Sequence, residues 1–305
     1  MASPLDPRSP HAQAIADLFT TTFFVCGAIF AIVAGLIGYA VFKFRDREGA
    51  TASQTEGHKR LELAWTAAPA AIVTWLFVLT MRAMNASDPP PDREPDLVVI
   101  AHQWWWEVRY ASGAVTANEL HIPTGKPLVV AIESADVIHD FWVPDLGRKI
   151  DAVPGRRVNI WLEADQAGTY LGTCAEYCGV QHAWMRLMVV AESPEAFAAW
   201  DKHTREPAPA AATESEARGA KLFTSMTCVK CHAITGNGEG ARAAPDLTHL
   251  ADRKTLGSGV VENNPTELAR WLKHPQDLKR GCHMPDVQLS DTQVADFVAY
   301  FGALK

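Results

Sequence analysis

The chain contains 305 residues, enough for two or three domains, and its 28 basic and 35 acidic side chains give a net charge of −7. Residues 91–206 hold 10 Lys and Arg against 17 Asp and Glu, a difference that accounts for the whole net charge. This balance excludes a uniformly basic nucleic-acid-binding protein, and the hydrophobic content of 48% excludes a disordered chain. Six cysteines are too few for a disulfide scaffold.

Two long uncharged segments lie near the N-terminus. Residues 18–42 are 25 consecutive uncharged residues, and residues 63–81 are 19 more. A membrane-spanning helix needs about 20. We therefore predict an N-terminal segment, 1–90, with two helices in a lipid membrane, at about 18–42 and 63–83. The alternative is a pair of buried helices in a soluble core, which rarely stay free of charge over such a length.

The loop between these segments carries most of the basic residues of this region, and they are Lys43, Arg45, Arg47, Lys59 and Arg60. Residues 1–17 contain only Arg8. The positive-inside rule places the loop in the cytoplasm, so we expect the N-terminus and everything after about residue 85 on the periplasmic or extracellular side of a bacterial inner (cell) membrane. We recognise no cleavable signal peptide in residues 1–17, although one could have been removed before the numbering begins.

The remainder of the chain separates into two predicted domains. Proline-rich residues 87–96 lead into a domain at 91–204, where the runs LVVIA, KPLVVAIE and RVNIWLEA are rich in strand-forming residues. These runs predict an all-β sandwich or barrel. A second linker, 205–217, precedes a domain at 218–305 with helical patterning. There Ser290 and Gln293 form the sequence pattern of a capping box.

The β-domain contains a concentration of soft metal ligands. TCAEYCGVQHAWM places Cys174, Cys178, His182 and Met185 at steps of four, four and three, and His139 lies 35 residues upstream. Zinc seldom uses methionine, whereas one Cys, two His and an axial Met form a mononuclear copper site. The second cysteine allows two thiolates to bridge two copper ions. Taken alone, the cysteines could instead form a disulfide.

This segment resembles the binuclear copper (CuA) loop of subunit II of haem–copper cytochrome c oxidases, and the resemblance extends over much of residues 15–200. It implies a Mg²⁺ or Mn²⁺ ion shared with subunit I, bound by the side chain of Glu176. The implied copper ligands are the bridging Cys174 and Cys178, the terminal His139 and His182, the weak ligand Met185, and the backbone carbonyl of Glu176.

Two further segments match the same family. AHQWWWEVRY resembles the aromatic segment over the copper site, which implies that Trp104 is the electron entry residue. The alternatives for Trp104 are β-domain core or an interfacial aromatic belt. RLELAWTAAPA is similar to the segment whose glutamate, here Glu62, lies at the mouth of a proton-uptake channel in subunit I. A glutamate just outside a membrane span could also simply be solvated.

The last domain contains CVKCH, with Cys228, Cys231 and His232. C-x-x-C-H is the attachment sequence of c-type haem, in which both thiols bind the haem covalently and the histidine is an axial ligand. Methionine is the usual sixth ligand of an electron-carrying cytochrome c. We predict Met284 in this role, with Met226 and His283 as competitors.

This domain resembles a class I cytochrome c. The resemblance implies that the carbonyl of Pro245 accepts a hydrogen bond from His232, and that Gly219 allows the first helix to pack closely on the last near Tyr300. Cys282 departs from the family pattern, and the sequence predicts no role for it.

Taken together, the sequence resembles subunit II of a caa(3)-type oxidase: a two-helix transmembrane hairpin, an all-β cupredoxin-like domain and an all-α class I cytochrome c domain. The resemblance implies an electron-entry subunit that takes electrons from cytochrome c or another donor through haem c and CuA. Its partners would be subunits I and III, with oxygen reduction and proton translocation in subunit I. The alternatives are a quinol oxidase subunit, a CuA-containing nitric oxide reductase subunit and a membrane-anchored copper-delivery protein.

Overall fold

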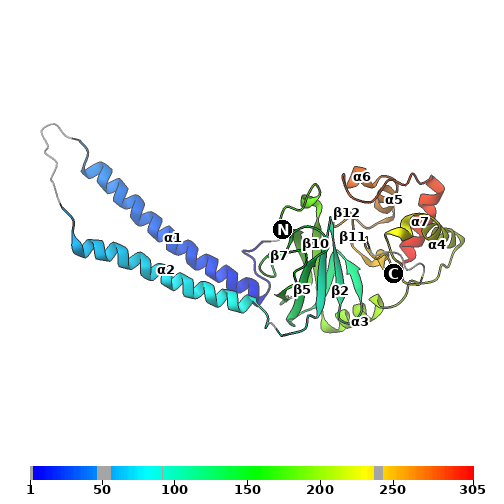
Figure 1. The fold of residues 1–305 in the computed structure, drawn as a ribbon, viewed down its shortest axis with the longest axis horizontal. Coiled ribbons are helices and arrows are strands. Elements are labelled where there is room, and N and C mark those ends of the chain that lie inside the picture. The colour runs from blue at the N-terminus through cyan, green and yellow to red at the C-terminus, as the bar shows by residue number, and fades with distance from the viewer. Residues whose placement is uncertain (1–2, 47–55, 91, 237–242) are drawn as a thin grey trace. The chain divides into compact units, whose positions relative to one another are not determined.

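The computed structural model describes residues 3–46, 56–90, 92–236 and 243–305, so Arg47 of the predicted cytoplasmic loop lies outside the described residues. The chain divides into two compact units (Figure 1). One consists of residues 13–87, and the other of residues 3–12 and 88–305. Each unit is described by itself.

The first unit is formed by two helices, α1 (Pro10–Lys43) and α2 (Lys59–Ser87), both long and apolar enough to cross a membrane. Their side chains are largely exposed, as lipid-facing side chains would be, and Cys26 is among the exposed residues of α1. Three threonines of α2 donate their hydroxyls to carbonyls four residues earlier, so these donors need no water. They are Thr66, Thr74 and Thr80.

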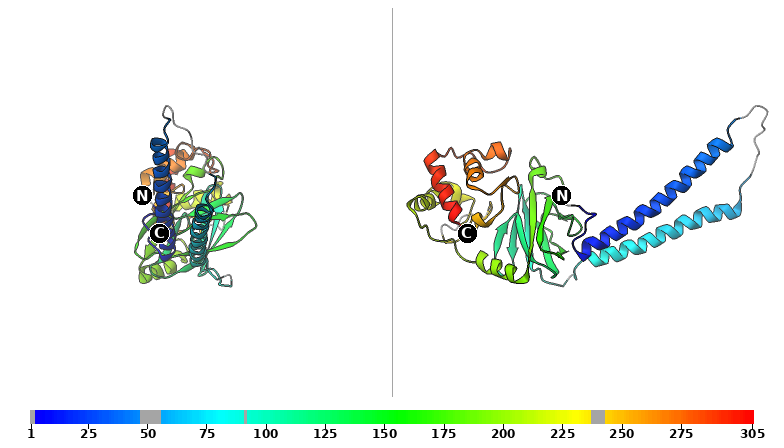
Figure 2. Two further views of the ribbon diagram at one scale, coloured as in Figure 1. Left: turned by 90° about the vertical axis from the view of Figure 1, so that its left-hand side faces the viewer. Right: turned by 180° about the vertical axis from the view of Figure 1, so that it is seen from behind.

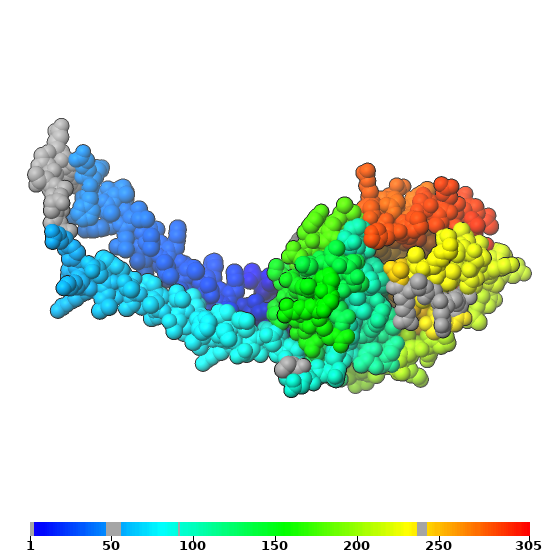
Figure 3. All heavy atoms as spheres, viewed as in Figure 1, coloured from blue at the N-terminus to red at the C-terminus, as the bar shows by residue number. Residues whose placement is uncertain are grey.

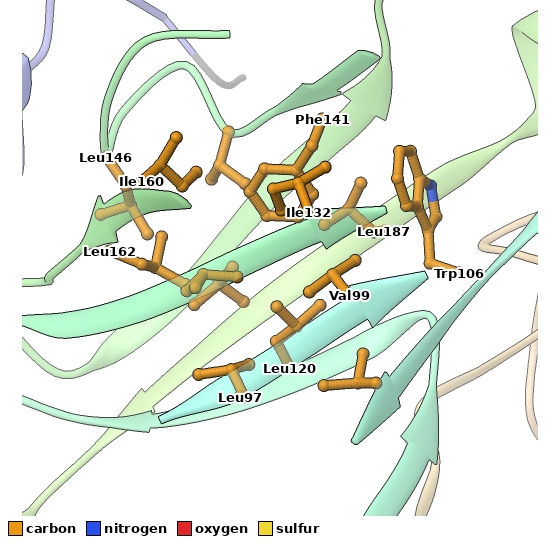
Figure 4. Packing of buried hydrophobic residues seen from close by; sticks show 14 of the residues in the cluster. Leu97, Val99, Trp106, Leu120, Ile132, Phe141, Leu146, Ile160, Leu162 and Leu187 are labelled. Carbon is orange, nitrogen blue, oxygen red and sulfur yellow. The ribbon is translucent and has the colours of Figure 1, made fainter. Parts of the chain in front are cut away.

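Ten strands form two five-stranded sheets, in the orders β3-β2-β1-β5-β8 and β4-β10-β9-β6-β7. Apolar side chains from both sheets, including Val99, Leu120 and Phe141, pack between them (Figure 4). This confirms the cupredoxin-like β-domain, and the three predicted runs are β1, β5 and β8. The strands are β1 (Leu97–His102), β2 (Trp105–Tyr110), β3 (Val115–Ala117), β4 (Glu119–Pro123), β5 (Leu128–Ser134), β6 (His139–Trp142), β7 (Ile150–Ala152), β8 (Val158–Leu162), β9 (Gly168–Cys174) and β10 (Arg186–Glu192).

The C-terminal domain is mainly helical, as predicted. Its first and last helices pack against each other because Gly219 has no side chain: a Cβ there would lie 2.6 Å from Cβ of Tyr300. Ser290 caps the last helix and forms the expected capping box with Gln293. The elements after β10 are α3 (Pro194–Thr204), α4 (Glu214–Ser225), η2 (Cys228–Lys230), η3 (Leu250–Asp252), β11 (Thr255–Leu256), β12 (Val261–Glu262), α5 (Pro265–Lys273), α6 (Pro275–Leu278) and α7 (Asp291–Ala303).

The helical domain is docked on the β-domain, and both belong to one compact unit (Figures 2 and 3). The carboxylate of Glu119, which is buried, accepts hydrogen bonds from the backbone N–H groups of Lys254 and Thr255 at 2.8 and 3.0 Å. The ammonium of Lys254 donates to the hydroxyl of Thr169 at 3.1 Å. The 205–217 segment therefore connects two domains that touch directly, and its last four residues belong to α4.

Candidate metal centres

The structure brings the predicted copper ligands together. His139 begins β6 and Cys174 ends β9, and these two strands are paired in one sheet. Cys178 and His182 come from the loop that follows β9, and Met185 directly precedes β10. Sγ of Cys174 lies 3.9 Å from Nδ1 of His139, and Sγ of Cys178 lies 3.7 Å from Nδ1 of His182 and 3.9 Å from Sδ of Met185. Each histidine thus faces a different thiol.

The two thiols do not form a disulfide. Their sulfur atoms are 3.8 Å apart, whereas a disulfide bond is about 2.05 Å long. The hydrogen bond between them lowers the pKa of Cys174 and raises the pKa of Cys178, because a proton on one thiol stabilises the thiolate of the other. Both are buried with His139 and Met185. Two unbonded sulfur atoms lie side by side, and each faces one imidazole nitrogen. This set of donor atoms fits two copper ions bridged by the sulfurs.

Asp136 holds one of these histidines in place, and sequence reasoning missed it. Its Oδ1 lies 2.7 Å from Nε2 of His139, which leaves Nδ1 to face the thiol. Its other oxygen accepts the backbone N–H of Gln103 at 2.6 Å. The spacing of three residues between Asp136 and His139 was the only signal in the sequence, and it is too common to be diagnostic.

Glu176 presents two different groups. Its backbone oxygen lies 3.2 Å from Sγ of Cys174, close to the thiol pair. Its carboxylate is on the exposed side of the loop and accepts only the neighbouring N–H of Tyr177 at 3.2 Å among the described residues. The backbone oxygen fits the copper cluster, and the carboxylate is free to bind a hard cation from outside.

Trp104 lies against the copper loop. Its indole N–H donates to the carbonyl of Cys178 at 3.0 Å, and the side chain of Gln103 donates to the same oxygen at 2.8 Å. Gly179, with φ +118°, makes room for the indole, because a Cβ there would lie 3.0 Å from the ring. Trp104 is therefore joined to a predicted copper ligand by a single hydrogen bond.

A cavity of about 350 Å³ is lined mainly by residues of the helical domain and is large enough for a cofactor site. Cys228, Cys231 and His232 all line it. Nδ1 of His232 donates to the carbonyl of Pro245 at 2.7 Å, which fixes the ring and leaves Nε2 as the metal-binding nitrogen. Burial lowers the pKa of His232, which favours the neutral imidazole that an iron ligand requires.

Met284 also lines this cavity, whereas Met226 is not among its described lining residues. The side chain of Gln276 donates to the carbonyls of Met284 and Cys282, both at 2.9 Å, and fixes this loop. The Cys282 thiol lies in the same wall, and burial raises its pKa. The arrangement suits Met284 as the sixth ligand of a haem.

The cavity has a wall from the β-domain, which the sequence did not predict. Trp104 and Trp105 line it together with the residues of the helical domain. The rings of Trp104 and His283 have centroids 4.9 Å apart. One indole therefore lines the cavity that contains Cys228, Cys231 and His232 and also contacts the loop of predicted copper ligands.

Glu62 lies in the separate helical unit. It is in the first turn of α2, is exposed, and accepts the backbone N–H of His58 at 3.1 Å.

Three family models match successive parts of the chain. They are "Cytochrome C oxidase subunit II, transmembrane domain" at residues 5–82, "Cytochrome C oxidase subunit II, periplasmic domain" at 111–192 and "Cytochrome c" at 216–305. A cytochrome c oxidase subunit 2 of Alkalihalophilus pseudofirmus is 33% identical over 99% of this chain and 90% of its own length. The chain belongs to the cytochrome c oxidase subunit II family. This confirms the predicted family and fold class, and it makes the chain part of a haem–copper oxidase.

Other relatives of this oxidase subunit match a smaller share of the chain. Cytochrome c oxidase subunit 2 of Bacillus subtilis is 31% identical over 88% of this chain and 82% of its own length. A quinol oxidase subunit 2 of Bacillus cereus is 30% identical over 67% of this chain and 74% of its own. Copper and haem c are the cofactors that the matched domains imply.

Proposed function

We propose that this chain is the electron-entry subunit of a caa(3)-type cytochrome c oxidase, taking electrons from cytochrome c or another donor. Haem c and the CuA copper pair, when bound, would supply one-electron redox chemistry between the donor and subunit I, where oxygen reduction and proton translocation would take place. The observation that carries the proposal is Trp104, which lines the haem cavity and donates a hydrogen bond to Cys178.

Two separate sets of residues would hold the two cofactors. Cys228 and Cys231 would hold the haem covalently, with His232 and Met284 as axial ligands. Pro245 supports this role because its carbonyl orients the His232 ring. At the other site the copper pair would be held by Cys174, Cys178, His139, His182, Met185 and the backbone of Glu176. Burial of Cys174, Cys178, His139 and Met185 excludes water and reduces the rearrangement that accompanies a change of charge.

The remaining proposals concern neighbours of the subunit. The exposed carboxylate of Glu176 would bind Mg²⁺ or Mn²⁺ together with subunit I, and Glu62 would lie at the entrance of its proton channel. Subunit III would complete the complex. The two apolar helices anchor the subunit in a bacterial cell membrane, with the N-terminus and both metal domains on the outer side.

The alternatives explain fewer of these features. A quinol oxidase subunit would need no copper ligands, yet all five predicted side-chain ligands converge. A copper-delivery protein would need no haem attachment sequence in a cofactor-sized cavity. A nitric oxide reductase subunit would share both sites, so this alternative requires measurement.

The test is Cys178→Ser in the complex purified from membranes. The variant is expected to lose the mixed-valence two-copper signal in electron paramagnetic resonance while its haem c absorbance remains. An unchanged copper signal would refute the bridging role of Cys178. Turnover of the wild-type complex with O₂ and with NO separates the oxidase from the reductase, because only the oxidase is expected to consume O₂ rapidly.

A further inference from the structure

Lys279, directly after α6, is buried between the two metal domains and only 4% exposed. Its ammonium donates hydrogen bonds to the carbonyl of Trp104 in the β-domain and to the carbonyl of Gly257 in the helical domain, both at 2.9 Å. It forms no salt bridge within the described part of the chain. Lysines are rarely buried without a charged partner, so this position is energetically costly.

The energetic cost of burying Lys279 is reflected in the pKa of its side chain. Burial lowers the pKa of Lys279 to about 8, so the ammonium is less stable here than in water. An apolar residue of similar length would avoid this penalty. In exchange for this penalty, the ammonium joins the carbonyls of Trp104 and Gly257 across the boundary between the two domains, which an apolar residue could not do.

Hydrogen bonds hold both the main-chain carbonyl and the side chain of Trp104. Its carbonyl accepts from Lys279 and also from the hydroxyl of Ser258 at 3.0 Å, and both donors belong to the helical domain. Its indole N–H is bonded to Cys178 in the copper loop. Oδ1 of Asn118 in the β-domain lies equally close to the Ser258 hydroxyl, at 3.0 Å, so the single hydroxyl proton is shared between these two acceptors. The helical domain thus fixes the main chain of Trp104 while the copper loop fixes its side chain.

We propose that Lys279 is a positioning residue for electron transfer between the two metal domains: by clamping the carbonyl of Trp104, it holds the indole between the haem cavity and Cys178. This inference rests on the proposed function. Lys279 lines the cavity but has no hydrogen bond to a predicted copper or haem ligand among the described residues. It acts through Trp104.

The test uses the complete oxidase complex carrying Lys279→Met. A photoexcited ruthenium dye injects an electron into haem c, and the absorbance of haem c and of the copper pair follows its transfer. We expect transfer to slow by about tenfold or more, because small misplacements at a reacting centre have effects of this order. The matched control is Lys254→Met, which removes another lysine of the same interface that bonds to Thr169 and not to Trp104. Its rate is expected to stay at the wild-type value.

A double-mutant cycle shows whether the effect passes through Trp104. In a Trp104→Leu background, Lys279→Met is expected to cause no further slowing. Hydrogen exchange of residues 103–106 gives a readout independent of electron transfer, and this segment is expected to exchange faster in Lys279→Met than in Lys254→Met. Ser258→Ala removes the second donor from the same carbonyl without touching a buried charge, and is expected to slow transfer as well.

Three results would overturn the proposal. They are an unchanged rate in Lys279→Met, equal slowing in Lys254→Met, and additive slowing in the Trp104→Leu background. A wild-type complex that transfers no electron from haem c to copper would instead refute the proposed function.

Discussion

Oδ1 of Asp136 lies 2.7 Å from Nε2 of His139, while Oδ2 of the same carboxylate accepts the backbone N–H of Gln103. One carboxylate therefore orients a predicted copper ligand and also fixes the residue before Trp104. It forms a second connection between the predicted copper ligands and the segment that contains Trp104, besides the hydrogen bond from Trp104 to Cys178.

Replacing Asp136 with Asn should weaken copper binding, because the amide orients the imidazole less firmly than the carboxylate does. Loss of such a partner typically lowers metal affinity by about 10- to 100-fold. Copper retention during titration with a chelator measures this, with exposed Asp165→Asn as the control. Equal copper affinity in the two variants would contradict the role of Asp136.

The sixth haem ligand can be identified with two matched substitutions. Met284→Ala should remove the methionine–iron charge-transfer band and lower the reduction potential of haem c, since methionine ligation raises it. Met226→Ala should leave both unchanged, because Met226 is outside the described lining of the cavity. If the band disappeared in Met226→Ala instead, the assignment would be reversed.

Gly219→Ala should destabilise the haem domain. Its Cβ would lie 2.6 Å from Cβ of Tyr300 and closer still to the carbonyl oxygen of Asp296, so α4 and α7 would have to separate. Overpacking of this kind costs about 1–3 kcal/mol of unfolding free energy. Gly302→Ala is the control, because no atom lies within 4 Å of its Cβ position. Denaturant unfolding followed by haem absorbance compares the two, and equal stability would refute the close packing.

The haem domain should lose stability in acid through Asp296. Hydrogen bonds from Arg218 and Ser215 lower the pKa of this carboxyl below its ordinary value. A carboxyl with a lower pKa in the folded state stabilises the fold above the unfolded value of about 3.9, and this contribution is lost as the pH falls through the folded pKa. The melting temperature of the haem domain should therefore fall below about pH 4 in the wild type, and less steeply in Asp296→Asn. If the melting temperatures of the wild type and of Asp296→Asn fell equally with pH, Asp296 would not contribute to the acid sensitivity.

The sequence predicted the local parts of both sites. Cys174, Cys178 and His182 lie within nine residues, and Cys228, Cys231 and His232 within five, so residue type and spacing indicated metal and haem sites, and the family resemblance implied the full ligand sets. His139 was expected at the copper site despite its distance along the chain, and the pairing of β6 with β9 is what brings it to this loop. Strand pairing between distant segments leaves no periodic pattern in the sequence.

The contacts between the domains could not be predicted in the same way. Lysine is usually a surface residue, so nothing in the sequence indicated that Lys279 would be buried and bonded to Trp104 of the other domain. The sequence likewise does not indicate that Glu119 lies at a domain interface, although its carboxylate accepts hydrogen bonds from two backbone N–H groups of the other domain. Such contacts depend on the shapes of two folded surfaces, and the segment between the domains does not encode them.

The shared wall of the haem cavity affects how this cytochrome can be studied. Trp104 and Trp105 close one side of the cavity, so an excised helical domain would expose that side to water. Water stabilises the more highly charged oxidised haem, and a reduction potential measured on the excised fragment would be too low for the intact subunit. The driving force of the internal electron transfer is therefore a property of both domains together, and neither domain in isolation reproduces it.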